Sequence, residues 1–143
     1  MPDSELKRGQ IANVAKATQW RDYSGLRFER NITPTDIDGS VDFDGELFVM
    51  LEHKSKGAPM SHGQRLHLES ITKAINSGGK NAACLICEHD TPTDQPINGA
   101  DAKVVEYLWW GNQKWMRPHL SISTYNAILK LKELHAKGLE AVQ

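Results

Sequence analysis

The sequence predicts a mixed α/β fold, in which helices pack against a sheet that has parallel and antiparallel strands. Short apolar runs typical of strands alternate along the chain with segments whose apolar residues recur at helical spacing. The chain has 143 residues, enough for one domain to bury an adequate core without disulfides or a structural metal. We therefore expect a single domain over residues 1–143, with the element order α-β-β-α-β-β-α.

The first elements are a helix and two strands. Ser4 is suited to cap a helix that ends near residue 18. Residues 37–43 alternate between apolar and polar side chains, which predicts a strand with one polar face. Residues 47–51 form a continuous apolar run, typical of a strand buried on both faces. The sequence leaves open whether a further strand precedes Asp36.

The later elements follow from capping and turn signals. Ser61 is suited to cap a helix that reaches about Asn76, and the glycines after Ser77 end it. The remaining segments are predicted to be a strand, a polar loop, a hairpin around Gly111-Asn112 and a last helix, over residues 82–87, 89–101, 104–116 and 123–137.

Charge is unevenly distributed, although the net charge is only −1. Six acidic residues and no Lys or Arg lie between Asp36 and Glu52. Basic residues predominate from Lys54 to Lys80 and again from Lys103 to Lys137. An acidic centre with basic flanks suits a metal site that cuts phosphodiester bonds, and it equally describes an ordinary solvated surface.

Glu52 and Lys54 are unusual because they end a buried strand on the same face, where burying charge is costly. Whether Asp36 and Asp38 share that face depends on the hairpin loop. A two-residue loop, Asp44-Gly45, turns both aspartates away from Glu52. A three-residue loop, residues 43–45, places Asp36 opposite Glu52 and Asp38 opposite Met50.

With the three-residue loop, carboxylates and a lysine converge. Hard cations such as Mg²⁺ or Mn²⁺ prefer carboxylate and carbonyl oxygens. We expect Asp38 and Glu52 to bind the cation, with the backbone carbonyl of His53 as a third ligand. Lys54 is then suited to orient or deprotonate a water molecule, or to stabilise the charge that develops on the phosphate.

The spacing Asp-x(13)-Glu-x-Lys, formed by Asp38, Glu52 and Lys54 at the end of an apolar strand before a helix, resembles the PD-(D/E)xK nuclease superfamily. Residues 38–54 are most similar to Holliday-junction resolvases and small phage nucleases. The resemblance implies a restriction-endonuclease-like fold with an α-β-β-β-α-β core. It also implies that Asp38 and Glu52 bind metal, that Lys54 is the catalytic lysine, and that Gln64 on the next helix assists.

The sequence departs from the family pattern in two places. Ile37, rather than a proline, precedes Asp38, and Asp36 is an extra acid that competes with Asp38 for the role of metal ligand. Some members carry a glutamate on the first helix. Glu5 and Glu29 are the candidates for that role here.

DNA is the partner that the resemblance implies, and resolvases are usually symmetric dimers, so a homodimer is expected. The basic residues expected to contact DNA are Lys56, Arg65, Arg30 and Lys114. Trp109, Trp110 and Trp115 suggest base stacking, although at least one of them should belong to the core.

The cellular setting is expected to be the cytoplasm of a microbial or phage-infected cell. Two cysteines and a polar N-terminus fit a reducing compartment, and no apolar run approaches the roughly 18 residues that cross a bilayer. The alternatives to a structure-selective endonuclease are a single-strand or nicking nuclease of DNA repair, replication or a mobile element, and a catalytically idle member that binds nucleic acid or protein. An unrelated protein with a structural cation is a further alternative.

Overall fold

The computed structural model describes residues 19–138. The predicted first helix, with Ser4 and Glu5, lies outside these residues. The chain divides into two compact units, residues 1–34 and 35–143. The expected single domain over residues 1–143 stays a prediction.

The described part of the first unit is irregular and exposed. Its regular element is the 3-10 helix η2, Glu29–Asn31, in which Arg30 and Asn31 have φ angles of 59° and 60°. No strand occurs between residues 19 and 38, so the strand left open before Asp36 is absent from this described segment. Its side chains are solvent-exposed, and they therefore provide no buried face on which a sheet strand would be stabilised.

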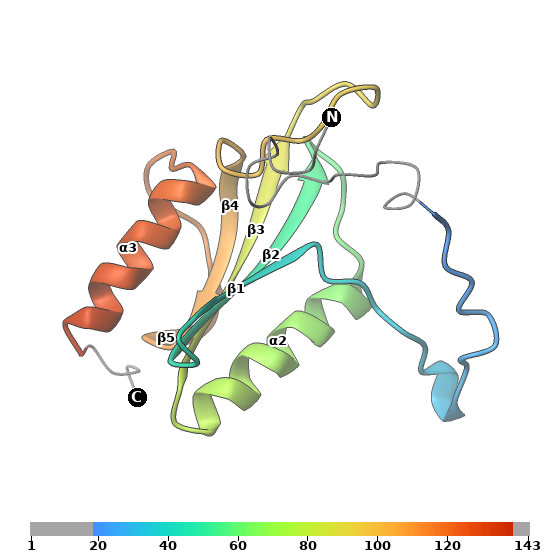
Figure 1. Cartoon of the computed structure of the whole chain (residues 1–143), viewed down its shortest axis with the longest axis horizontal. Coiled ribbons are helices and arrows are strands. Elements are labelled where there is room, and N and C mark those ends of the chain that lie inside the picture. The colour runs from blue at the N-terminus through green and yellow to red at the C-terminus, as the bar shows by residue number, and fades with distance from the viewer. Residues whose placement is uncertain (1–18, 139–143) are drawn as a thin grey trace, which may run out of the picture. The chain divides into compact units, whose positions relative to one another are not determined.

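The second unit is built on a five-stranded sheet in the order β1-β2-β3-β4-β5 (Figure 1). All neighbouring strands are antiparallel except β2 and β3, which are parallel. The strands are β1 (Gly39–Phe43), β2 (Leu47–Ser55), β3 (Asn81–His89), β4 (Lys103–Trp109) and β5 (Asn112–Met116). The mixed sheet that the sequence predicts is therefore confirmed.

One helix covers each face of this sheet (Figure 1). Helix α2 (His62–Ser77) connects β2 to β3, as a parallel pair requires. Helix α3 (Thr124–Ala136) covers the opposite face. Both begin at the serine that the sequence predicts, because Ser61 Oγ accepts a hydrogen bond from Gln64 N and Ser123 Oγ accepts one from Asn126 N.

The core lies on both faces of β3, where the six residues 82–87 are buried. Cys84 packs with Met50 and Leu68 on the α2 face, whereas Cys87 packs with Leu85 on the α3 face. Both cysteines are free. They are therefore buried core residues on opposite sides of one strand, as their spacing predicts.

The hairpin between β1 and β2 sets the position of the acidic residues. Phe43 pairs with Leu47, so the loop has three residues, Asp44 to Glu46. A three-residue loop is one of the two predicted, but residues 43–45 are the wrong three. Asp44 and Gly45 both adopt positive φ, 58° and 70°, and Asp42 Oδ1 accepts a hydrogen bond from Gly45 N at 2.7 Å. These local interactions move the turn one residue towards β2.

This one-residue shift changes which aspartate faces Glu52. The register Gly39↔Leu51, continued by one residue, brings Asp38 opposite Glu52. The register predicted for a three-residue loop placed Asp36 there and Asp38 opposite Met50, which is wrong: Met50 pairs with Ser40. The expectation that Asp38 shares a face with Glu52 holds, because both registers have the same parity.

Two further features bear on the expected fold. Within residues 19–138, two strands precede α2, whereas the α-β-β-β-α-β core implies three. The described helices include none long and apolar enough to cross a membrane.

Candidate active site

The candidate site lies where β1 begins beside the end of β2, on the α2 face of the sheet. Asp38 directly precedes β1 and is fixed to β2, because its Oδ2 accepts a hydrogen bond of 2.7 Å from His53 N. Glu52 and Lys54 project from β2 on the same face as Met50, which packs against α2. The structure therefore brings together Asp38 and Glu52, the two acids that the sequence predicts as cation ligands.

Glu52 is the buried acid of the site, with 7% of its surface exposed. Its Oε1 accepts a hydrogen bond from Gln64 Nε2 at 3.3 Å, while its Oε2 is buried and has no partner among the described residues. Burial raises the pKa of Glu52 to about 7, and the negative charges of Asp38 and Asp36 contribute. Among the described residues, no positive neighbour offsets the burial of this carboxylate.

Gln64 reaches Glu52 from the first turn of α2. Its position is set by the Ser61 cap, whose Oγ accepts from Gln64 N at 3.1 Å and also lies 3.2 Å from Gln64 Oε1. The sequence predicts that Gln64 assists the site, and the structure places it in contact with Glu52 rather than with Lys54.

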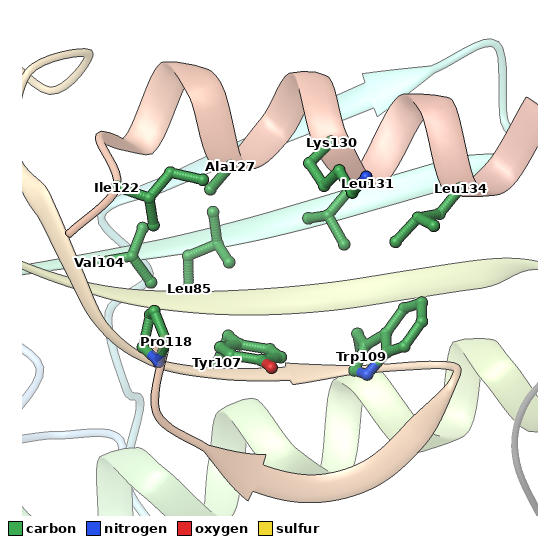
Figure 2. A pocket seen from close by; sticks show the side chains of 10 residues that line it. All are labelled: Leu85, Val104, Tyr107, Trp109, Pro118, Ile122, Ala127, Lys130, Leu131 and Leu134. Carbon is green, nitrogen blue, oxygen red and sulfur yellow. The ribbon is translucent and has the colours of Figure 1, made fainter. Parts of the chain in front are cut away.

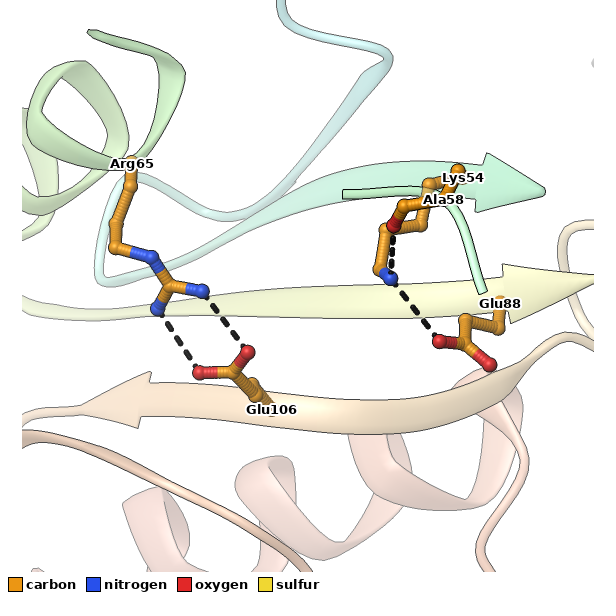
Figure 3. Close-up of polar contacts among 5 residues, drawn as sticks. All are labelled: Lys54, Ala58, Arg65, Glu88 and Glu106. Carbon is orange, nitrogen blue, oxygen red and sulfur yellow. Dashed lines mark hydrogen bonds and ion pairs between the residues drawn. The ribbon is translucent and has the colours of Figure 1, made fainter. Parts of the chain in front are cut away.

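Lys54 is held by two acceptors (Figure 3). Its Nζ donates to the carbonyl oxygen of Ala58 at 2.6 Å and to Glu88 Oε1 at 3.0 Å. Glu88 is the register partner of Lys54 on β3, so the ion pair spans the parallel strands. The lysine is therefore anchored at the end of β2.

Arg65 is bound to Glu106 on β4 (Figure 3). Its two terminal nitrogens donate to the two carboxylate oxygens at 2.9 Å each, and its guanidinium lies 4.9 Å from the centre of the Trp115 ring. Arg65 keeps the pKa of Glu106 below its ordinary value, and the hydrogen bond with Glu106 raises the pKa of Arg65. Arg65, predicted to bind DNA, is thus already paired within the fold.

Glu88 and Glu106 are the site residues that sequence reasoning missed. Both lie on the α2 face, and Glu88 follows Ile86 in β3 as Lys54 follows Glu52 in β2. The alternation of residues 82, 84, 86 and 88 carried a signal for Glu88. The pairing with Lys54 additionally required the parallel register, which the sequence does not show.

The other predicted DNA contacts are more scattered. Lys56 is exposed and borders a polar cavity of about 440 Å³ that Glu88 and Lys103 also line. Lys114 is exposed on β5. Arg30 is exposed in the first unit, as is Glu29, so neither is placed relative to this site.

The three tryptophans between residues 109 and 115 are mainly packing residues. Trp110 is 2% exposed and belongs to the core on the α3 face, which confirms that at least one Trp is internal. Trp115 packs against the α2-side core, and Trp109 against the α3-side core. Base stacking by Trp109 or Trp115 stays a prediction.

An apolar cavity of about 270 Å³ lies on the opposite face of the sheet, beneath α3 (Figure 2). Its walls include Leu85, Tyr107 and Trp109 from the sheet and Ile122, Leu131 and Leu134 from the α3 region. It shares no lining residue with the Glu52 site and is unsuited to a cation or a phosphate.

The oxygen donors beside Glu52 fit a hard divalent cation. Within residues 19–138, no three His, Cys, Asp or Glu side chains form a ready metal-binding group, so two carboxylates need a further donor. In a strand, the N–H and the C=O of one residue point towards the same neighbouring strand. Because the His53 N–H donates to Asp38, the His53 carbonyl also points towards the side on which Asp38 lies. Glu52 Oε2 has no partner among the described residues, so it is available as an oxygen ligand for such a cation.

The comparisons with known proteins supply no family: no family model, no curated protein and no solved structure matches this chain.

Proposed function

We propose that the chain is a metal-dependent DNA endonuclease of the PD-(D/E)xK type, with Asp38, Glu52 and Lys54 at its centre. One observation carries the proposal. The buried Glu52 carboxylate has one oxygen without a partner within residues 19–138, lies beside a second carboxylate, and is followed two residues later by an anchored lysine. A buried carboxylate beside a second carboxylate is an unfavourable arrangement unless a cation neutralises their charge.

Each residue has a role in this proposal. Asp38, Glu52 and the His53 carbonyl would hold Mg²⁺ or Mn²⁺, and Asp36 is the outer acid. The cation, when bound, supplies an activated water and neutralises phosphate charge. Gln64 holds one oxygen of Glu52 and leaves the other for the metal. Lys54 donates a hydrogen bond to the phosphate on which charge develops.

The proposal extends to the substrate. We propose DNA, with a branched substrate such as a four-way junction first and a single-stranded or nicked substrate second. Lys56 and Lys114 are exposed and suited to contact phosphates, and a homodimer would present two sites to a junction. A cytoplasmic location in a microbial or phage-infected cell fits such a substrate.

A second candidate is a catalytically idle protein that binds nucleic acid on the same scaffold. The observation that favours it is the pairing of Lys54 with Ala58 and Glu88, because two of the three N–H bonds of the ammonium are already used. Cleavage itself distinguishes this candidate from the enzyme.

The test is cleavage of labelled linear duplex, single-stranded, flap, nicked and four-way-junction DNA, each with Mg²⁺, Mn²⁺ or EDTA. Lys54→Ala is the informative variant, and Lys73→Ala, which removes a partly exposed ion pair of α2 with Glu69, is its matched control. Cleavage that requires metal, survives in Lys73→Ala and disappears in Lys54→Ala supports the enzyme. DNA binding without cleavage of any substrate by the folded wild type favours the idle binding protein.

A further inference from the structure

Lys54 and Glu88 are held together by the architecture of the sheet rather than by chance contact of two long side chains. They are register partners in the parallel pairing of β2 and β3, on the face that also carries Glu52 and Ile86. The register therefore places the two side chains next to each other on one face of the sheet.

The environment of the pair is semi-enclosed. The Lys54 and Glu88 side chains are 18% and 24% exposed, and Nζ lies 3.0 Å from Glu88 Oε1. The loop after β2 folds back so that the Ala58 carbonyl accepts from the same Nζ at 2.6 Å. Two acceptors from different segments restrict a side chain that would otherwise sample many rotamers.

The Lys54–Glu88 pair matters more for the position of the ammonium than for folding stability. An ion pair of this exposure contributes little to the free energy of folding, since its Coulomb energy is offset by desolvation and ordering. Its geometric effect is larger, because it selects one position of the Lys54 ammonium two residues beyond Glu52.

From this geometry, and resting on the proposed nuclease activity, we propose that Glu88 is a positioning residue for Lys54. Glu88 and the Ala58 carbonyl fix two N–H bonds of the ammonium, and the third is left for the scissile phosphate. Glu88 acts through Lys54 and does not touch the substrate. Small displacements of a positioned group reduce turnover strongly, which gives this contact a kinetic consequence beyond its stability.

The test uses Glu88→Ala and Glu88→Gln in the full chain. The amide oxygen of glutamine still accepts from Lys54 Nζ, whereas alanine does not. Glu46→Ala is the matched control, because Glu46 pairs with Lys80 at the opposite end of the same two strands, at 2.7 Å. For Glu88→Ala we expect kcat to fall by about tenfold or more with KM nearly unchanged. For Glu88→Gln and Glu46→Ala we expect kcat within about threefold of wild type.

A second readout needs no catalysis. The ammonium N–H signal of Lys54 in ¹H–¹⁵N spectra, assigned by its loss in Lys54→Ala, should be present in wild type and Glu88→Gln and broadened by solvent exchange in Glu88→Ala. Folding of each variant is followed by thermal unfolding.

The outcomes separate this inference from the function on which it rests. Wild-type kcat and an unchanged Lys54 signal in Glu88→Ala would overturn the positioning role alone. Equal losses of kcat in Glu88→Ala, Glu88→Gln and Glu46→Ala would also overturn it, because they would reflect general damage to the strand pair. A wild type that cleaves no DNA would remove the nuclease proposal, and the inference with it.

Discussion

Asp38 Oδ2 accepts a hydrogen bond of 2.7 Å from the backbone N–H of His53. The side chain takes the place of a ladder partner where β1 has not yet begun, since the strand pairing starts at Gly39↔Leu51. It therefore holds the Asp38 carboxylate against the strand that carries Glu52. Asp36 lies two residues further from β1, although its charge still contributes to the raised pKa of Glu52.

This difference predicts which aspartate the activity requires. Asp38→Asn should lower kcat/KM for DNA cleavage by about a hundredfold or more, because it removes a carboxylate from the proposed metal site. Asp36→Asn should lower it by only a few-fold. Steady-state cleavage at saturating Mn²⁺ measures both. The reverse order of the two variants would assign the metal to Asp36 and contradict the role given to Asp38.

Much of the fold was predictable because local signals and tertiary packing agree. The apolar run of β2, the Ser61 cap of α2 and the buried strand β3 each match the expected element. For the hairpin, the sequence left a two-residue and a three-residue loop open, and the structure has a three-residue loop. Which three residues form it depends on the left-handed conformation of Asp44 and on the Asp42 hydrogen bond, and neither follows from hydrophobic pattern.

The site was predictable to the extent that it lies on one strand. Glu52 and Lys54 are two residues apart, so their common face follows from strand geometry alone. Glu88 and Glu106 come from β3 and β4, and their contacts with Lys54 and Arg65 depend on sheet register and helix placement. The sequence therefore suggested free basic residues where the folded chain has ion pairs.

The raised pKa of Glu52 predicts how stability depends on pH in the absence of divalent cations. Between about pH 4.5, its ordinary value, and about pH 7, the folded protein keeps a proton that the unfolded chain has lost. The free energy of unfolding should therefore fall as pH rises through this interval, by up to about 3 kcal/mol. Denaturant unfolding in EDTA at several pH values measures it. Glu52→Gln should flatten this part of the profile, and an unchanged slope in that variant would contradict the assignment.

Divalent cations should reverse this loss. At pH 8 the Glu52 carboxylate is charged, so Mn²⁺ or Mg²⁺ at about a hundred times its Kd should add about 3 kcal/mol to the free energy of unfolding. The stabilisation should disappear in Glu52→Gln and Asp38→Asn and persist in Asp42→Asn, an exposed aspartate of the same strand face. Thermal unfolding with and without cation provides the measurement. Equal stabilisation of all three variants would show that the cation binds elsewhere.

Replacing Lys56 and replacing Arg65 by alanine should affect different properties, DNA binding and folding stability, although the sequence suggested DNA contact for both. Lys56→Ala should weaken DNA binding on every substrate and reduce the slope of log Kd against log salt by about one, as for one lost phosphate contact. Arg65→Ala should instead lower the free energy of unfolding by about 2 kcal/mol, because it breaks the bidentate bond to Glu106 and the contact with Trp115. Fluorescence anisotropy over a salt series, together with denaturant unfolding, distinguishes the two effects.

Gly111 and Gly63 should have opposite effects when each is replaced by alanine. A Cβ at Gly111 would overlap the ring of Trp109, which packs edge-on against Trp110 with ring centres 5.1 Å apart. The ring borders the apolar cavity beneath α3, so it can yield only by disturbing that wall (Figure 2). Gly111→Ala should therefore lower the free energy of unfolding by about 2 kcal/mol.

Gly63 is the second residue of α2, and a methyl group there would meet no neighbouring atom within 4 Å. Gly63→Ala should therefore raise the free energy of unfolding, by up to about 0.5 kcal/mol, because alanine has the higher helix propensity and the position is in the first turn. Urea unfolding of both variants checks the signs, and a Gly111→Ala variant as stable as wild type would show that the hairpin relaxes without cost.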